Sequence, residues 1–341
     1  MTSQRSGPRV ARRVVVGVSV LAAFFSFAPQ LGAASRSLVV TGYLEDGSAP
    51  SFIDRSASAL STVGVDGVVL NNAGSTVSPV DASELALLAR SHARGLRADL
   101  LVSNYSNAID DFSPEVASHL LSSPSHIARV AMELARVVAR EGWNGLSVDL
   151  ESLDHHDAPG LVDFLSTLNH DLAPNVSLSV DVAAADSRTA YLAIGFNLVA
   201  LSHVVDHVVV MTYDEHGPWS GPGPIGALAW QARTLAALLR EVPPSQVDLG
   251  VAGYGYTWPA GSRLHDGVTL GDAQARSMVT KDHARAIWVP ASGEWTATLS
   301  NGTTLWWSDS RSYRLRAKLA RRDHLHGLAL WQLASSDPLK P

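Results

Sequence analysis

Polar and apolar side chains alternate strictly from Leu146 to Glu151. In a β-strand, alternate residues point to the same face, so Ser147, Asp149 and Glu151 share one face while leucine and valine occupy the other. Burying two acids and a hydroxyl costs free energy unless they have a purpose. A face of this kind suits acid–base chemistry, although the spacing alone leaves open a strand end whose acids simply meet solvent.

Eight apolar, strand-like segments follow residue 34, and amphipathic helical patterns separate most of them. The strand-like segments are Leu38–Leu44, Gly67–Leu70, Leu96–Val102, Gly145–Leu150, Val176–Val182, Val204–Met211, Val247–Ala252 and Gly327–Leu333. The helical patterns are Asp81–Ala93, His126–Glu141, Ala158–Leu172, Ala227–Glu241 and Ser310–Arg322. Apolar strands that alternate with helices indicate a buried parallel sheet.

Eight such units predict an α/β fold of the (β/α)8 TIM-barrel type. A doubly wound sheet is the alternative, but no G-x-G-x-x-G turn follows the first strand. In a barrel the polar face of Gly145–Leu150 points inward at the carboxyl end, where barrel enzymes keep their sites.

The connection between the seventh and eighth strands, from Thr257 to His326, is unusually long. It contains three strand-like pieces, Ala286–Val289, Trp295–Leu299 and Thr304–Trp307, and a Ser-Asn-Gly turn joins the last two. These features predict a small α+β insertion at about residues 259–310, inside a barrel domain of residues 35–341.

The acids of the fourth strand resemble the signature of glycoside hydrolase family 18, Asp-Gly-x-Asp-x-Asp-x-Glu. Asp149 and Glu151 match the last two acids, whereas Asn144 and Ser147 stand in place of the first two. The sixth strand ends in Met211-Thr212-Tyr213-Asp214, as it does in the family, and Trp331 lies on the eighth strand where the family places a tryptophan. The resemblance covers roughly Leu38 to Leu333.

Further motifs are similar to the family's spore-germination, or cortex-lytic, N-acetylglucosaminidase subgroup. They are Gly253-Tyr254-Gly255-Tyr256-Thr257-Trp258 after the seventh strand, the run Met211–Gly226, and Trp307-Ser308-Asp309-Ser310 before the last helix. The resemblance implies a secreted glycosidase that cleaves the glycan strands of peptidoglycan. A chitinase, acting on chitin or chitooligosaccharides, is the first alternative. A carbohydrate-binding protein without activity is the second, because Asn144 and Ser147 depart from the signature.

The resemblance also implies roles for the motif residues. The family uses the substrate's own 2-acetamido group as nucleophile. Glu151 would protonate the leaving oxygen with a raised pKa, and Asp149 would orient the acetamide nitrogen. Tyr213 would hydrogen-bond the acetamide oxygen and Asp214 would help to hold the sugar. Trp331 would stack on the sugar ring.

Four further residues are candidates for the same site. Tyr43, Tyr254 and Tyr256 sit at strand ends, where they either line the substrate site or pack in the core. Ser147 can donate a hydrogen bond to Asp149 but holds no charge. Asp149 should therefore stay ionised to lower pH than it would beside a second aspartate.

The composition excludes several partners. The formal net charge is −6 and no basic block interrupts the chain after its first residues, so a nucleic-acid partner is not expected. Neither His155-His156-Asp157 nor the pair His203 and His207 forms a convincing ligand set, so neither a metal nor a cofactor is predicted. The partner is a polysaccharide substrate, and the protein is expected to be a monomer.

The first 34 residues have the pattern of a secretory signal. Arginines at 5, 9, 12 and 13 precede an apolar run from Val14 to Ala28, and small residues follow. This pattern predicts a secreted or cell-wall-associated protein with no membrane domain after cleavage. An uncleaved N-terminal anchor is the alternative. Since the chain contains no cysteine, no disulfide stabilises it.

Overall fold

The computed structural model describes residues 38–261 and 266–341. The predicted signal segment, residues 1–34, lies outside the described residues. Among the described residues, no helix combines the length and the apolar character needed to cross a membrane.

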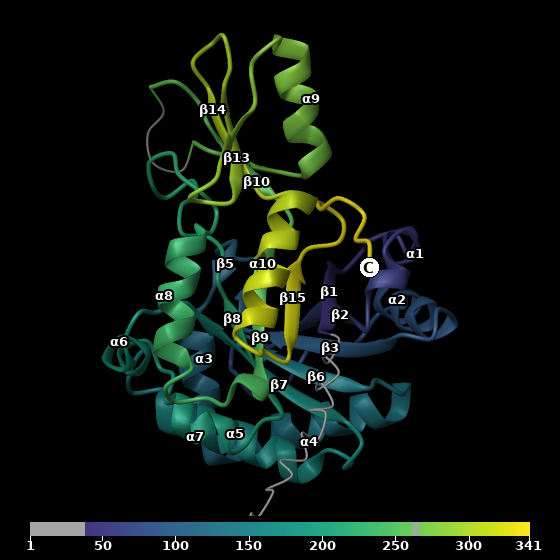
Figure 1. Cartoon of the computed structure of the whole chain (residues 1–341). Helices are drawn as coiled ribbons and strands as arrows, with labels where there is room; N and C mark the ends of the chain where they lie inside the picture. The colour runs from purple at the N-terminus through teal and green to yellow at the C-terminus, as the bar shows by residue number, and fades with distance from the viewer. Residues whose placement is uncertain (1–37, 262–265) are drawn as a thin grey trace, which may run out of the picture. The chain divides into compact units, whose positions relative to one another are not determined.

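Eight parallel strands close into a barrel, which confirms the predicted fold (Figure 1). They are β1 (Val39–Glu45), β2 (Thr62–Val69), β3 (Arg97–Ser103), β6 (Gly145–Asp149), β7 (Ser177–Ala183), β8 (His207–Met211), β9 (Val247–Ala252) and β15 (Gly327–Trp331). Their order around the barrel is β1-β15-β9-β8-β7-β6-β3-β2, and β1 pairs with β2 to close it. Because every strand is parallel to its neighbours, all carboxyl ends meet at one end of the barrel.

Helices cover the outside of the barrel, and their apolar faces join the outward side chains of the strands in one large core. The predicted helices are present as α2 (Ala82–Ala93), α4 (Pro124–Glu141), α5 (Ala158–Asp171), α8 (Leu228–Leu238) and α10 (Ser310–Arg322). Sequence signals fix their ends. Asp81 forms a capping box with Glu84 at the start of α2, and Gly142 ends α4 in the left-handed region at φ 86°.

Four short helices escape the sequence pattern: α1 (Ser51–Asp54), α3 (Pro114–Leu121), α6 (Arg188–Ala193) and α7 (Leu198–Ser202). Helices of four to eight residues are too short for helical periodicity to show. Strand β2 begins at Thr62, earlier than the expected Gly67, because Gly64 and Asp66 break its apolar run. The glycine at 64 is required by packing, since a Cβ there would lie 2.4 Å from the ring of Tyr43.

The connection between β9 and β15 forms the predicted α+β insertion. Its five-stranded sheet has the order β11-β10-β14-β13-β12. The strands are β10 (Gly255–Trp258), β11 (Thr269–Leu270), β12 (Ile287–Val289), β13 (Glu294–Thr298) and β14 (Thr304–Trp307). Helix α9 (Asp272–Asp282) lies beside this sheet, and the two share a small apolar core (Figure 1). A short hairpin of β4 (Tyr105–Ser106) and β5 (Asp111–Phe112) follows β3.

Candidate active site

Strand β6 turns its polar face into the barrel and its apolar face toward the helices. Ser147 and Asp149 are buried, at 2% and 7% exposure, and Glu151 is half-buried just beyond the strand end. Leu146, Val148 and Leu150 belong to the large core. The alternation in the sequence therefore produces the side-chain segregation expected from it.

Glu151 is held in place through its main chain. Its amide donates to Oδ1 of Asn104 at 2.9 Å, and Nδ2 of Asn104 donates to the carbonyl of Glu151 at 2.9 Å. Burial, together with the negative charges of Asp214 and Asp111, raises the pKa of Glu151 to about 7. A carboxyl group with this pKa is still protonated in slightly acidic solution, as a general acid must be.

Asn104 did not stand out in the sequence, where it falls in an Asn-Tyr-Ser sequon. It follows the last residue of β3, is fully buried, and also donates to the carbonyl of Ser113 at 2.9 Å. Its side chain thus bridges the ends of β3 and β6. Only the register between these strands reveals this contact.

A second buried acid, Asp181 on β7, faces the same space. Ser147 donates to Oδ1 of Asp181 at 3.2 Å and accepts a hydrogen bond from Ser179 at 2.8 Å. Burial and the charge of Glu151 raise the pKa of Asp181 to about 8, against the lowering effect of the Ser147 hydrogen bond. The signal that could have found Asp181 is the alternation of Ser177 to Val182, which repeats the pattern of β6.

Asp149 therefore has acidic neighbours even though serine occupies position 147. Burial and the charges of Glu151 and Asp181 raise the pKa of Asp149 well above its usual value. The second aspartate that acts on Asp149 comes from the adjacent strand, which the sequence analysis did not foresee, and the comparison with an aspartate at position 147 stays a prediction. The Oδ1 atom of Asp149 is buried and has no hydrogen-bond partner among the described residues.

Asp214 lies three residues beyond the end of β8, in the left-handed region at φ 62°. Its Oδ1 accepts hydrogen bonds from the hydroxyls of Tyr254 and Tyr256, at 2.5 and 2.9 Å. Burial raises the pKa of Asp214, and these two hydrogen bonds partly offset the rise. The preceding residue, Tyr213, places its ring edge-on to Tyr254 with 6.3 Å between centroids. Tyrosine hydroxyls thus hold Asp214 at the end of β8.

Trp331 joins two aromatic groups at the end of β15. It packs against the cluster that contains Tyr254 and Tyr256 and against Tyr43, whose ring centroid is 5.8 Å away. Trp331 keeps part of its surface exposed, whereas the three tyrosines are only 4–6% exposed. Trp331 therefore stays partly accessible, as do Tyr213 and Trp306 of the same cluster, whereas the three buried tyrosines pack beside it.

The loop between β8 and α8 carries an exposed aromatic residue that the sequence analysis did not single out. Trp219 is 47% exposed and lies edge-on to Tyr256, 5.8 Å away. The indole of Trp258 anchors the loop by donating to the carbonyls of Gly217 and Ser220, at 3.1 and 3.0 Å. Trp219 is thus an exposed aromatic surface beside the tyrosines that hold Asp214.

A buried ion pair fixes the far end of this loop. Glu294 on β13 accepts from the amides of Ile225 and Gly226, at 2.7 and 3.0 Å. Arg316 on α10 donates to Glu294 at 2.9 Å, and each side chain is 1% exposed. With its hydrogen bonds satisfied in this way, the pair ties the insertion and α10 to the loop that carries Trp219.

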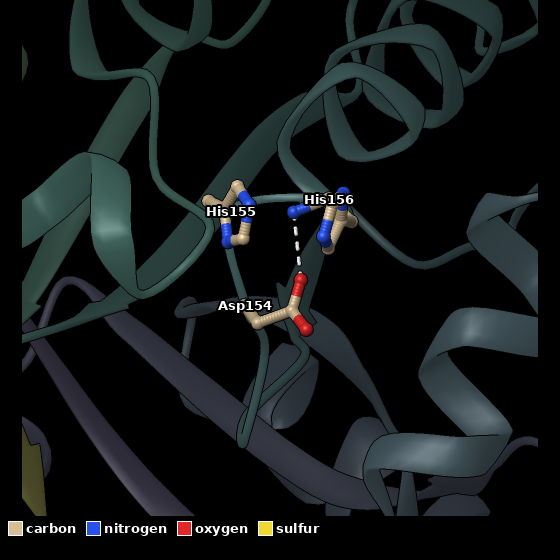
Figure 2. A group of neighbouring side chains, drawn as sticks. All are labelled: Asp154, His155 and His156. Atoms are coloured by element: carbon tan, nitrogen blue, oxygen red, sulfur yellow. Dashed lines mark hydrogen bonds between the residues drawn. The ribbon is translucent and has the colours of Figure 1, made fainter.

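The histidine pair after β6 lies in an exposed turn. Figure 2 shows Asp154 accepting a hydrogen bond from the amide of His156, 2.7 Å away, with His155 between them in the chain. All three residues are exposed, and the two imidazole centroids are 3.8 Å apart. The carboxylate of Asp154 therefore stabilises the turn in which it lies.

The sequence matches the family model described as Glycosyl hydrolases family 18 over residues 102–337. The chain therefore belongs to glycosyl hydrolase family 18, and it is a glycosidase that acts on a polysaccharide.

Among curated proteins it resembles the uncharacterized glycosylase YvbX of Bacillus subtilis, with 21% identity over 333 residues, 94% of this chain and 95% of the relative. It also resembles the cortical fragment-lytic enzyme of B. subtilis, with 25% identity over 258 residues; the match covers 70% of this chain but 57% of that protein. These relatives support the spore-germination subgroup.

Solved structures share the barrel. A chitinase from Chromobacterium violaceum superposes with a TM-score of 0.80 at 24% identity, over 88% of this chain and 96% of that one. The spore cortex-lytic enzyme SleL of Bacillus cereus does so with a TM-score of 0.79 at 18% identity, over 88% and 72%. At these identities the likeness establishes the fold.

Proposed function

We propose that this glycosidase hydrolyses β-1,4 bonds at N-acetylglucosamine in the glycan strands of peptidoglycan, by substrate-assisted catalysis with retention of configuration. The observation that carries the proposal is the pair on the inner face of β6. Glu151 is an acid with a pKa of about 7, and Asp149 beside it has a buried oxygen without a hydrogen-bond partner. One group supplies a proton and the other accepts an N–H.

In the first step the carbonyl oxygen of the substrate's 2-acetamido group attacks the anomeric carbon. The glycosidic bond breaks, and the leaving oxygen takes the proton of Glu151. The free oxygen of Asp149 accepts the acetamide N–H and stabilises the positive charge of the oxazolinium ring. Tyr213 donates to the acetamide oxygen, Asp214 holds the sugar, and Trp331 stacks on its ring.

In the second step a water molecule attacks the anomeric carbon. It gives its proton back to Glu151, and the acetamide is restored. Two inversions at one carbon retain the β configuration. No protein carboxylate is needed as nucleophile, and Asp149 shares a strand face with Glu151 rather than lying across from it.

Asp181 replaces a missing member of the family signature in this proposal. Ser147 cannot ionise as an aspartate would, but its hydroxyl donates a hydrogen bond to Asp181 at 3.2 Å. Burial and the charges of Glu151 and Asp181 raise the pKa of Asp149, so Asp149 holds a proton more readily than an ordinary aspartate, and Asp181 on β7 is the second acid beside it. The two strands together supply the acid pair that the signature of other members places on one strand.

Peptidoglycan is favoured as substrate by the cortical fragment-lytic relative and by the motifs around Tyr254 and Asp214. With the signal pattern of residues 1–34, we place the protein outside the cytoplasmic membrane, secreted, associated with the wall or anchored there. The same chemistry would serve on chitin, so the substrate is decided by experiment.

The test is a parallel assay on purified peptidoglycan and colloidal chitin, each with matched de-N-acetylated material. We expect new reducing ends from peptidoglycan, little from chitin, and none after de-N-acetylation, because the nucleophile is then missing. Faster release from chitin would overturn the substrate, and equal rates on de-N-acetylated glycan would overturn the mechanism. Binding to either glycan without any turnover would favour a non-catalytic carbohydrate-binding protein.

A further inference from the structure

A cavity of about 440 Å³ with a mixed polar and apolar lining lies at the amino-terminal end of the barrel, opposite the end that carries Glu151. Its lining includes the polar residues Thr41, Asp99, Ser179, His207 and Asp248. The interior of a (β/α)8 barrel is usually filled by branched apolar side chains. Buried polar groups in their place require partners, and family 18 chemistry takes place at the other end.

Three potential metal ligands come together in this cavity. His207 begins β8, Asp248 is the second residue of β9, and His326 immediately precedes β15. One donor atom from each lies within 4.8 Å of the other two. These strands are consecutive in the barrel order, so the cluster is produced by the closure of the barrel and is invisible in the sequence.

The hydrogen bonds of the cluster are incomplete. His326 Nδ1 and Asp248 Oδ1 are 2.8 Å apart, and the imidazoles of His207 and His326 stack with 3.9 Å between centroids. Nδ1 of His207, however, is buried with no hydrogen-bond partner within residues 38–261 and 266–341. The same holds for Oδ1 of Asp99, which lies 4.0 Å from the guanidinium of Arg97, beyond hydrogen-bond distance.

Two glycines lie against the carboxylates of Asp248 and Asp99. A Cβ on Gly327 would lie 2.6 Å from Oδ1 of Asp248, and a Cβ on Gly145 would lie 2.5 Å from Oδ1 of Asp99. A side chain at Gly145 would press on the Asp99 carboxylate and on Ser177 Oγ, and one at Gly327 would press on Asp248 and, more closely, on the carbonyl of Val39, 2.3 Å away. The backbone at this end of the barrel is thus shaped around two acidic side chains.

We propose that His207, Asp248 and His326 bind one divalent transition-metal ion, of which Zn²⁺ fits best. Two imidazoles and one carboxylate are a zinc ligand set, whereas Mg²⁺ and Ca²⁺ prefer oxygen alone. Ligands of a tetrahedral zinc lie about 3.4 Å apart, and the donor atoms here lie within 4.8 Å of one another, so binding requires the two stacked imidazoles to rotate toward a common point. Asp99, which shares the cavity, offers a carboxylate for a metal-bound water.

The bound ion would cross-link three consecutive strands, including the one that completes the barrel. The chain has no cysteine, so a disulfide cannot do this. An ion that binds only the folded state stabilises it in proportion to the logarithm of its concentration. The site is therefore a stabilising element at the end of the barrel away from the substrate.

The test uses the full chain without an affinity tag, stripped with EDTA and titrated with ZnCl₂ in a calorimeter. We expect one Zn²⁺ per chain and a higher melting temperature with the metal. His207→Gln and His326→Gln should each weaken binding at least tenfold, because each removes one of three ligands. The double variant His155→Gln, His156→Gln is the matched control, since it removes the exposed pair of Figure 2 and should bind as the wild type does.

Three results would overturn the proposal: no saturable binding by the wild type, binding lost only in the His155/His156 control, or binding unchanged in both His207 and His326 variants. If those variants fail to fold, Co²⁺ added to the wild type gives the answer. A visible spectrum of a nitrogen- and oxygen-ligated ion that Zn²⁺ displaces supports the site, and its absence refutes it. Because no glycan is used, the outcome is independent of the proposed hydrolysis.

Discussion

The two ends of the barrel interior carry different polar clusters on the same set of strands. At the carboxyl end, burial and neighbouring negative charges raise the pKa of Asp149, Glu151 and Asp181, and aromatic rings lie close by. At the amino end, two imidazoles and a carboxylate surround a small cavity. A thin layer that includes Leu101, Val209 and Ala329 fills the barrel between them.

The difference shows how one architecture supports two kinds of recognition. Mutually repelling carboxyl groups hold protons, which suits acid catalysis on a sugar, and exposed aromatic faces suit sugar rings. Imidazole nitrogens beside a carboxylate hold a cation instead. The two clusters should therefore respond independently to mutation, and the first prediction below tests that independence.

The largest effect is expected for Glu151→Gln. The amide keeps the shape and removes the proton donor, so turnover should fall by a factor on the order of 10² to 10⁴. Zinc binding at the amino end should not change. Steady-state hydrolysis and calorimetry on one preparation measure both, with Glu115→Gln on the exposed face of α3 as the matched control. Near-normal hydrolysis by the Glu151 variant would remove this residue from the mechanism.

Asp181→Asn should have the next largest effect. Losing the second acid should lower kcat roughly 10- to 100-fold, with little change in KM, and should shift the acidic limb of the pH–rate profile. A purely structural role would leave that limb in place. Adding Asp at position 147 in the Asp181→Asn background should restore part of the activity by returning an acid to β6. A double variant no better than Asp181→Asn would argue against a shared role.

Asn104→Ala should lower turnover about tenfold, because Glu151 loses both main-chain hydrogen bonds to that side chain. Leaving buried polar groups unpaired should also cost about 1–3 kcal/mol of stability. Chemical denaturation and steady-state kinetics measure the two effects. Asn104→Asp, which keeps one acceptor, serves as the comparison. If the kinetics are unchanged while stability falls, the hydrogen bonds of Asn104 do not position Glu151 for catalysis.

Glu151 should contribute to the pH dependence of stability. The folded-state pKa of Glu151, about 7, lies above its unfolded value, so the folded state binds more protons between about pH 4.5 and 7. Stability is then greatest below this window and falls as pH rises through it. The melting temperature should drop by roughly 2–5 °C between pH 5.5 and 8. The drop should be smaller in Glu151→Gln, which has no group to ionise; an equal drop in both proteins would contradict this origin.

Trp219→Ala should have the smallest effect. The ring is 47% exposed, so its loss should leave the melting temperature nearly unchanged. If it contacts glycan, KM should rise about two- to fivefold while kcat stays constant, as expected when binding is lost equally in ground and transition states. Trp219→Phe should retain most of the affinity. An unchanged KM of Trp219→Ala on polymeric substrate would show that the glycan does not contact Trp219.

The sequence by itself determined the barrel, the insertion and the family. Strand periodicity and helix caps are local signals, and eight repeats of them leave few topologies. The fourth-strand motif identified Asp149 and Glu151 because alternation along one strand fixes which side chains share a face. Similarly, the Gly-Tyr-Gly-Tyr run after β9 identified the two tyrosines that hold Asp214.

Only the tertiary structure decided which strands lie next to one another. Three contacts join strands that are far apart in the chain. They are the hydrogen bond from Ser147 to Asp181, the hydrogen bonds between Asn104 and the main chain of Glu151, and the cluster of His207, Asp248 and His326. Register between parallel strands depends on how the whole barrel closes. A pattern within one segment carries no information about the residue that closure places opposite it.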